Sequence, residues 1–250
     1  MCATCGCGAE DRHGGEEHHA HHHGAEGDER ARTIRLEHDV LGKNRGFAAE
    51  NRRRLDAAGI FAVDVLGGPG AGKTALLERL LRDRAPGEPI AVIEGDLATA
   101  RDADRIRAAG APVVQITTGA VCHLDAHMVG HALDALAPPA GSTLFVENVG
   151  NLVCPAMFDL GVHERLVVFS ITEGEDKPLK YPPMFTAATV VVLSKIDLAP
   201  HLDVDLGRAE AAVREVNPGA PVLRVSARSG EGMDGLRSWL ASRRSAARAG

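Results

Sequence analysis

Aromatic side chains are scarce in this sequence of 250 residues, in which six Phe, one Tyr and one Trp make up 3% of the chain. No apolar run reaches 18 residues, which excludes a membrane-spanning helix of the usual length. A long stripe of Lys and Arg is also absent, and the formal net charge of −6 at pH 7 argues against a nucleic-acid partner. Because the N-terminus lacks the apolar core of a signal peptide, we expect a cytoplasmic protein with no membrane partner.

Cysteine is also uncommon, with five residues in the whole chain. An odd number of cysteines in a reducing compartment indicates metal ligands or reactive thiols rather than a set of disulfides. Cys2, Cys5 and Cys7 are spaced closely enough for three thiolates to bind one soft or borderline divalent ion. A redox-active cluster is the alternative interpretation.

The first 31 residues contain few large apolar side chains and many Gly, His, Asp and Glu residues. Such a composition cannot bury enough surface to fold alone, so we predict that residues 1–31 form a disordered metal-binding arm. Imidazoles among acidic residues are suited to Ni(II), Cu(II) or Zn(II), although a cloning tag is an alternative origin for the tract. The predicted ligands of the tract are His13, His18, His19, His21, His22 and His23.

Charged and apolar residues alternate from Arg35 to Gly59, which predicts one long or two short helices, and we assign residues 32–59 as a helical lead-in. In residues 60–250, Val-rich and Ile-rich runs alternate with helical patterns. Such near-continuous apolar runs are typical of strands that are buried on both faces of a parallel sheet. We therefore predict a doubly wound α/β domain that binds ligands beyond the carboxyl ends of its strands. The predicted strands lie near residues 60–66, 90–94, 112–116, 143–147, 166–171, 189–194 and 221–226.

A glycine-rich segment follows the first of these runs and reads G-G-P-G-A-G-K-T. It fits the phosphate-binding loop G-x-x-x-x-G-K-[ST] in the required context between a strand and a helix. Backbone N–H groups would surround the phosphates, Lys73 would reach the β- and γ-phosphates, and the Thr74 hydroxyl would bind Mg²⁺. A turn that only joins a strand to a helix is the alternative. The predicted nucleotide-binding residues here are Gly67, Gly68, Gly70, Ala71, Gly72, Lys73, Thr74 and Ala75.

Acidic residues follow two other predicted strands, in Glu94-Gly95-Asp96 and in Glu147-Asn148-Val149-Gly150-Asn151. Phosphoryl transfer requires an acidic group that holds Mg²⁺ or its water and a backbone N–H that senses the γ-phosphate. We predict that Asp96 and Glu147 have the first role, that Gly150 has the second, and that Lys73, Asp96 and Glu147 form the catalytic set. An acidic residue at a strand end is alternatively a helix cap.

Two later segments predict the nucleotide base. Ser194-Lys195-Ile196-Asp197 resembles the N-K-x-D motif of GTPases, in which the aspartate binds guanine and the lysine stem covers the ring. Ser194 replaces the usual asparagine. Ser226 and Ala227 resemble the second base-contacting loop of GTPases. This pattern favours GTP over ATP, and an ATP-dependent kinase is the competing interpretation.

The two internal cysteines lie near these segments, with Cys122-His123 at the start of a predicted helix and Cys154 shortly after Asn151. Two thiolates and one imidazole provide three ligands, and the fourth could be water or a group from another subunit. Isolated buried cysteines are alternatively inert small apolar residues. His127 and His131 follow His123 and share one helix face at i, i+4 spacing. We expect them to be ordinary residues of that face, and competing metal ligands are the alternative interpretation.

Taken together, these segments resemble the HypB family of hydrogenase nickel-incorporation GTPases, a class that dimerises in response to nucleotide. The resemblance implies slow hydrolysis of GTP to GDP and a homodimer in the GTP-bound state. It also implies nickel and zinc binding, and nickel delivery to the large-subunit precursor of a [NiFe] hydrogenase together with a partner metallochaperone. The matching segments read M-C-x-x-C-G-C-G, G-G-P-G-A-G-K-T, E-G-D-x-A-T, T-T-G-A-V-C-H-L-D-A, F-V-E-N-V-G-N-L-V-C-P-A-x-F-D-L-G and T-E-G-E-D-K-P-L-K-Y-P.

Carried over residue by residue, the N-terminal nickel site of the family falls on Cys2, Cys5 and Cys7. Its second metal site, which the family places at the dimer interface, falls on Cys122, His123 and Cys154. A GTPase for another metalloenzyme such as urease is the nearest alternative, although the N-terminal cysteine cluster argues against it. A nickel buffer that binds nucleotide without using it remains a third interpretation.

Overall fold

The computed structural model describes residues 23–119 and 121–249, with side chains from residue 39 to 248 within these ranges. Residues 1–39 and 40–250 form two separate units, and helix α1 (His23–Ala57) begins in the first. The helical lead-in predicted at residues 32–59 is therefore one long helix. This helix begins at His23, within residues 1–31 that we predicted as a disordered arm. The predicted arm ligands other than His23 lie outside the described residues, and the side chain of His23 does too.

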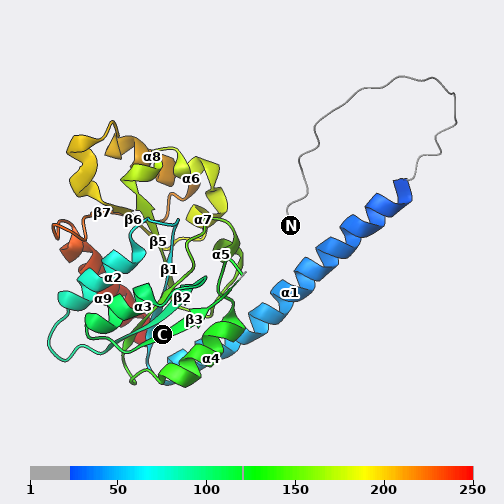
Figure 1. Cartoon of the computed structure of the whole chain (residues 1–250), viewed down its shortest axis with the longest axis horizontal. Coiled ribbons are helices and arrows are strands. Elements are labelled where there is room, and N and C mark those ends of the chain that lie inside the picture. The colour runs from blue at the N-terminus through cyan, green and yellow to red at the C-terminus, as the bar shows by residue number, and fades with distance from the viewer. Residues whose placement is uncertain (1–22, 120, 250) are drawn as a thin grey trace. The chain divides into compact units, whose positions relative to one another are not determined.

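The second unit contains a seven-stranded sheet in which every neighbouring pair of strands is parallel (Figure 1). The strand order is β3-β2-β4-β1-β5-β6-β7, so β1 is central. This confirms the doubly wound α/β prediction, and each predicted apolar run corresponds to one strand. The strands are β1 (Phe61–Leu66), β2 (Ile90–Asp96), β3 (Val113–Thr117), β4 (Thr143–Glu147), β5 (Glu164–Ser170), β6 (Val190–Ser194) and β7 (Val222–Val225).

Helices follow the strands and cover both faces of the sheet. Local signals explain two of their starts, because the carboxylates of Asp125 and Asp205 accept backbone hydrogen bonds at the first turns of α4 and α8. In the part of the chain that the structure describes, no helix is both long and apolar enough to cross a membrane. The helices are α2 (Lys73–Arg82), α3 (Arg101–Ala108), α4 (Ala126–Leu136), α5 (Cys154–Met157), η1 (Ile171–Glu173), α6 (Lys177–Lys180), α7 (Pro182–Thr186), η2 (Ile196–His201), α8 (Leu206–Val216) and α9 (Met233–Ala249).

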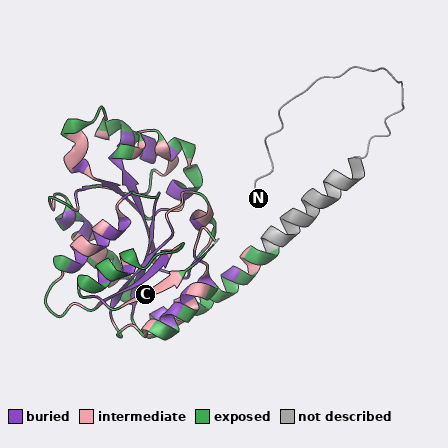
Figure 2. Ribbon diagram, in the orientation of Figure 1, coloured by how far each residue is buried: buried purple, intermediate pink, exposed green. Residues whose placement is uncertain are grey.

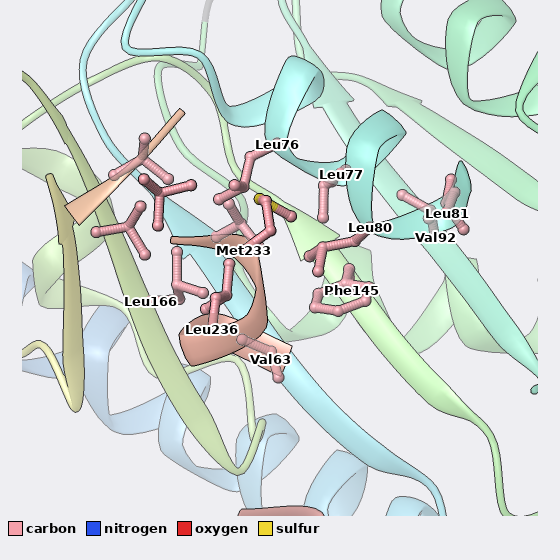
Figure 3. Packing of buried hydrophobic residues seen from close by; sticks show 14 of the residues in the cluster. Val63, Leu76, Leu77, Leu80, Leu81, Val92, Phe145, Leu166, Met233 and Leu236 are labelled. Atoms are coloured by element: carbon pink, nitrogen blue, oxygen red, sulfur yellow. The ribbon is translucent and has the colours of Figure 1, made fainter. Parts of the chain in front are cut away.

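Alternation along β1 divides the core between the two faces of the sheet. Val63 and Val65 pack on the face that α2 and α9 cover. Their apolar partners on this face include Leu76, Leu77, Leu80, Phe145, Leu166, Met233 and Leu236 (Figure 3). Ala62 and Leu66 point to the opposite face, where α4, α7, α8 and the end of α1 provide the apolar partners. Because both faces are covered, the strands are mostly buried (Figure 2), as their Val-rich sequences predict.

The last turns of α1 hold the start of α4 and the segment before β5. The Asn51 amide donates to the carbonyl oxygens of Ala126 (2.7 Å) and Leu160 (3.1 Å). The Asn44 amide donates to the Asp159 carbonyl oxygen at 2.7 Å, and its own oxygen accepts from the Ala126 N–H at 2.9 Å. Since Cys122 and Cys154 lie just before these two segments, the hydrogen bonds from α1 help to hold the backbone near both cysteines in position.

Candidate nucleotide and metal sites

The glycine-rich segment forms a loop between the carboxyl end of β1 and the start of α2. Gly67, Gly70 and Gly72 have φ values of 148°, 72° and 99°, which side chains with a Cβ atom rarely adopt. The Lys73 ammonium lies 3.4 Å from the carbonyl oxygens of both Gly67 and Gly68. Burial lowers the pKa of Lys73, and the nearby carboxylates, led by Glu147, oppose this shift. The loop and α2 therefore present a buried cation and a helix N-terminus to a cavity of about 380 Å³.

Two buried carboxylates face the same cavity. Glu147 on β4 accepts a hydrogen bond from the Thr74 hydroxyl at 2.7 Å, and it is the register partner of Glu94 on β2. Burial raises the pKa of Glu147 to about 7, and burial together with the charge of Glu147 raises the pKa of Glu94 to about 8. Among the described residues, the Oε2 atom of each carboxylate has no hydrogen-bond partner. Oxygen ligands without partners beside a threonine hydroxyl fit Mg²⁺ well.

Asp96 lines this cavity, but its carboxylate is engaged by the loop that follows β2. It accepts from the Leu97 N–H (2.6 Å), the Thr99 hydroxyl (2.6 Å) and the Thr99 N–H (3.2 Å). The hydrogen bond from the Thr99 side chain contributes most to lowering the pKa of Asp96. These contacts lie within the loop after β2, because the N-cap residue of α3 is Ala100 and no side chain caps that helix, so the helix-cap alternative is wrong for Asp96. A magnesium role for Asp96 stays a prediction. Glu94 is the more buried acid, and sequence reasoning did not single it out because its pairing with Glu147 depends on strand register.

The two predicted base-binding loops lie against the phosphate loop and against each other. The Ser194 hydroxyl donates to the Ala71 carbonyl oxygen at 2.7 Å, and the Lys195 ammonium donates to the Gly70 carbonyl oxygen at 2.6 Å. The Asp197 carboxylate accepts from the Ser226 hydroxyl at 2.6 Å. Serine in place of asparagine therefore still ties the end of β6 to the phosphate loop. Guanine recognition by Asp197 and Ala227 remains a prediction.

The segment after β4 runs along the phosphate loop. An added Cβ atom at Gly150 would lie 3.0 Å from Pro69 Cα, so only glycine allows this approach without displacement. Asn151 forms an isolated antiparallel bridge with Gly67. Asn148 holds the segment in place, because its side-chain oxygen accepts from the Leu124 N–H at 3.1 Å. The predicted position of Gly150 beside the phosphates is consistent with this arrangement.

Cys122, His123 and Cys154 come together, with one potential ligand atom from each lying within 4.8 Å of the others. The two sulfur atoms are 3.1 Å apart, and the His123 ring stacks on Phe158 with centroids 4.0 Å apart. Burial lowers the pKa of His123, while the contact with Cys122 contributes most to raising the pKa of Cys154. His123 Nδ1 is buried and has no partner within the described ranges. Two thiols and a neutral imidazole fit Zn(II) or Ni(II), with one coordination position left for another ligand.

Asn151 connects the two sites, a role that sequence reasoning did not assign. Its backbone pairs with Gly67 in the phosphate loop, and its amide donates to the Cys122 carbonyl oxygen at 3.2 Å. Its side-chain oxygen accepts from the Val153 N–H at 2.9 Å, next to Cys154. One residue therefore contacts the nucleotide loop and both cysteine-bearing segments.

Comparison with known proteins identifies the family to which this chain belongs. The CobW/HypB/UreG nucleotide-binding domain family matches residues 62–224. Hydrogenase maturation factor HypB of Rhizobium leguminosarum bv. viciae is 56% identical over 209 residues, covering 84% of this chain and 70% of that protein. HypB of Escherichia coli strain K12 is 41% identical over 290 residues, covering 98% of this chain and 100% of that protein. The crystal structure of Helicobacter pylori HypB in complex with nickel has a TM-score of 0.77 at 37% identity, covering 81% of this chain and 95% of that one. The chain therefore belongs to the HypB proteins of the CobW/HypB/UreG nucleotide-binding family.

Proposed function

We propose that this protein is a GTP-hydrolysing nickel metallochaperone that binds Ni(II) and Zn(II) and couples hydrolysis to nickel insertion into a [NiFe] hydrogenase precursor. The relatives named as hydrogenase maturation factors and the nickel complex of the Helicobacter pylori protein support the biological role. The observation that carries the proposal is the short segment 147–154. Glu147 contacts Thr74 at one end, and Cys154 contacts Cys122 at the other.

The nucleotide half of the proposal assigns a task to each group around the cavity. Lys73 and the loop N–H groups bind the phosphates, and Asp197 selects guanine through its carboxylate. Bound Mg²⁺ would offset phosphate charge, held by Thr74 and by Glu147 or Asp96 through water. We assign no general base among the residues of the cavity, because Glu147 and Asp96 are given to Mg²⁺ in this proposal. The protein therefore acts mainly by positioning water and phosphate, which favours slow turnover.

The metal half follows from the position of the cysteines. Cys122 and His123 lie just before α4, while Cys154 lies at the end of the segment that contacts the phosphate loop. A change in that segment between GTP and GDP alters the distance between Cys154 and the other two ligands. Metal affinity then depends on nucleotide state, and by linkage the metal changes nucleotide affinity by the same factor.

A homodimer would complete the metal site. The cluster has an open coordination position, and three large apolar side chains next to its cysteines are exposed: Val121, Val153 and Met157. A second copy in the GTP-bound state would cover these side chains and supply further ligands. Release of the dimer after hydrolysis would pass nickel to the hydrogenase large-subunit precursor or to a partner metallochaperone. The predicted N-terminal site of Cys2, Cys5 and Cys7 would receive or store the ion.

The test is a titration of the full chain with Ni(II) and Zn(II), combined with sedimentation, in GDP and in a non-hydrolysable GTP analogue. The comparison variant carries Cys122→Ala and Cys154→Ala. We expect the analogue to drive dimer formation and to change an affinity that the variant lacks. Metal binding that ignores the nucleotide and resides wholly in residues 1–31 would refute coupling and favour the nickel-buffer alternative. Competition between ATP and GTP in the same samples tests the kinase alternative.

A further inference from the structure

An acidic residue on the central strand β1 belongs to neither of the two sites. Asp64 is completely buried, and its Oδ1 atom accepts a hydrogen bond from the Asn148 side-chain amide at 3.2 Å. Its Oδ2 atom has no hydrogen-bond partner among the described residues. Burying a polar atom without a partner is unfavourable. A residue that only filled this space would be apolar, so the contact with Asn148 indicates a specific role for Asp64.

The contact with Asp64 sets the orientation of the Asn148 amide. The amide oxygen accepts from the backbone N–H groups of Leu124 at 3.1 Å and Val149 at 3.0 Å, and a backbone N–H can only donate. The amide nitrogen therefore points away from both groups, and Asp64 is the acceptor that the described residues provide for it. The opposite orientation would place an NH₂ group against two other donors. Asp64 thus favours the orientation in which Asn148 holds the Leu124 backbone.

Leu124 directly follows His123 in the chain and is fixed on two sides. Its N–H bonds to Asn148, and its side chain is completely buried. A Cβ atom added to Gly95 would lie 2.9 Å from side-chain carbons of Leu124, so this side chain packs directly on the backbone of β2. Because the two residues are adjacent, a shift of the Leu124 backbone also displaces His123.

A second neighbour of Asp64 holds the residue that stacks on His123. Arg165 on β5 is a register partner of Asp64. Burial raises the pKa of Asp64 to about 7, and the Arg165 charge is the largest of the effects that oppose this rise. The Arg165 guanidinium donates to the Phe158 carbonyl oxygen at 2.8 Å, and the Phe158 ring stacks on the His123 ring. Asp64 therefore interacts with two residues that hold the surroundings of His123, Asn148 through a hydrogen bond and Arg165 through charge.

We propose that Asp64 is a positioning residue for His123 in the cysteine cluster, and that it acts through Asn148 on the Leu124 backbone. This role rests on the proposed binding of Ni(II) and Zn(II) by the cluster. Groups that hold a metal-ligating histidine in place contribute to metal affinity without touching the ion. Loss of the Asp64 carboxyl group should therefore weaken metal binding by the cluster but not abolish it.

The experiment measures Zn(II) affinity in the full chain that carries Asp64→Ala. Binding by the cluster is the component that the variant with Cys122→Ala and Cys154→Ala lacks. Loss of the acceptor should lower this affinity roughly 2- to 12-fold, the factor for one hydrogen bond. Asp64→Asn keeps one oxygen that can accept from the Asn148 amide, so it should restore most of the affinity.

The matched control is Val167→Ala on β5. Val167 is also completely buried, but it packs in a cluster of apolar residues that does not include Leu124. The control should lower the free energy of unfolding and leave the Zn(II) affinity unchanged. The proposal is overturned if Asp64→Ala binds Zn(II) as tightly as the unchanged chain, or if Val167→Ala loses as much affinity as Asp64→Ala.

Hydrogen exchange of single amides, followed by NMR without metal, tests Asp64 separately from the proposed function. In Asp64→Ala the Leu124 N–H should exchange faster relative to the Val92 N–H, which bonds to the Pro112 carbonyl oxygen at 3.0 Å. In Asp64→Asn and Val167→Ala the ratio of the two rates should match that of the unchanged chain. Absence of cluster-dependent Zn(II) binding in the unchanged chain would refute the proposed function, whereas an unchanged ratio in Asp64→Ala would refute the positioning role.

Discussion

Replacing Asn151 with Ala removes the side chain that joins the segment after β4 to the cysteine cluster. The variant loses the hydrogen bond to the Cys122 carbonyl oxygen (3.2 Å) and the one from the Val153 N–H (2.9 Å). The backbone bridge to Gly67 needs no side chain and remains. The substitution therefore removes the side-chain contacts of Asn151 with the two cysteine-bearing segments and leaves the phosphate loop and the cysteine residues unchanged.

The expected magnitude follows from the one bond that reaches Cys122. A net hydrogen bond contributes about 0.5–1.5 kcal/mol, which corresponds to roughly a 2- to 12-fold change in an equilibrium constant. Allosteric coupling is typically about 1–3 kcal/mol, or roughly 5- to 150-fold in affinity. We expect Asn151→Ala to lower the ratio of Zn(II) affinities between the GTP-analogue and GDP states roughly 2- to 12-fold, the factor for one hydrogen bond.

The assay measures Zn(II) affinity in both nucleotide states for the unchanged chain and for Asn151→Ala. Asn217→Ala is the matched control, because the Asn217 amide bonds three backbone carbonyls beside α7, away from both sites. It should lower stability without changing the affinity ratio. If Asn151→Ala binds metal and nucleotide normally and keeps the full ratio, coupling does not pass through Asn151. A ratio of one in the unchanged chain would instead refute the proposed function itself.

Three further outcomes follow from single contacts. Thr74→Ala deletes the hydroxyl beside Glu147, so the factor by which Mg²⁺ increases GDP affinity should fall at least about tenfold. This factor is measured with a fluorescent GDP analogue, and the control Thr99→Ala should leave it unchanged. Ser194→Ala leaves the buried Ala71 carbonyl without its donor, so the free energy of unfolding should fall by about 1–3 kcal/mol in urea unfolding, and Ser194→Asn should restore part of it; unchanged stability would contradict this role. Burial raises the pKa of Asp64 to about 7 from 3.8, so its contribution to stability is full below pH 4 and is lost as the pH rises towards 7. In urea unfolding, the free energy of unfolding of the unchanged chain should therefore fall by about 2–3 kcal/mol relative to that of Asp64→Asn as the pH rises from 5 to 8. Equal pH profiles of the two proteins would show that Asp64 ionises normally.

The phosphate loop and the seven strands could be predicted because their signals lie within short stretches of sequence. The motif from Gly67 to Thr74 carries its own glycines, lysine and hydroxyl, and it needs only a strand before it and a helix after it. The strands were predictable because a parallel sheet that is covered on both faces requires continuous apolar runs. The cysteine cluster was also predicted from its residue types, through the resemblance to the HypB family.

Other features depend on how distant segments meet. The pairing of Glu94 with Glu147 depends on the register between β2 and β4, which composition does not encode locally. The engagement of the Asp96 carboxylate by the loop after β2 depends on contacts with Thr99 that are specific to this loop. The i, i+4 spacing of His127 and His131 was visible in the sequence, but the 3.1 Å separation depends on the rotamers of both rings.

The sequence by itself therefore determined the nucleotide loop, the parallel α/β class and the residue types available for metal binding. These properties arise from neighbouring residues and from a periodic burial pattern, both of which can be read along the chain. Only the tertiary structure placed Asn151 between Gly67 and Cys122, because residues 84 and 29 positions away meet there through sheet packing. The proposed coupling between nucleotide and metal depends on that convergence, and no local pattern predicts it.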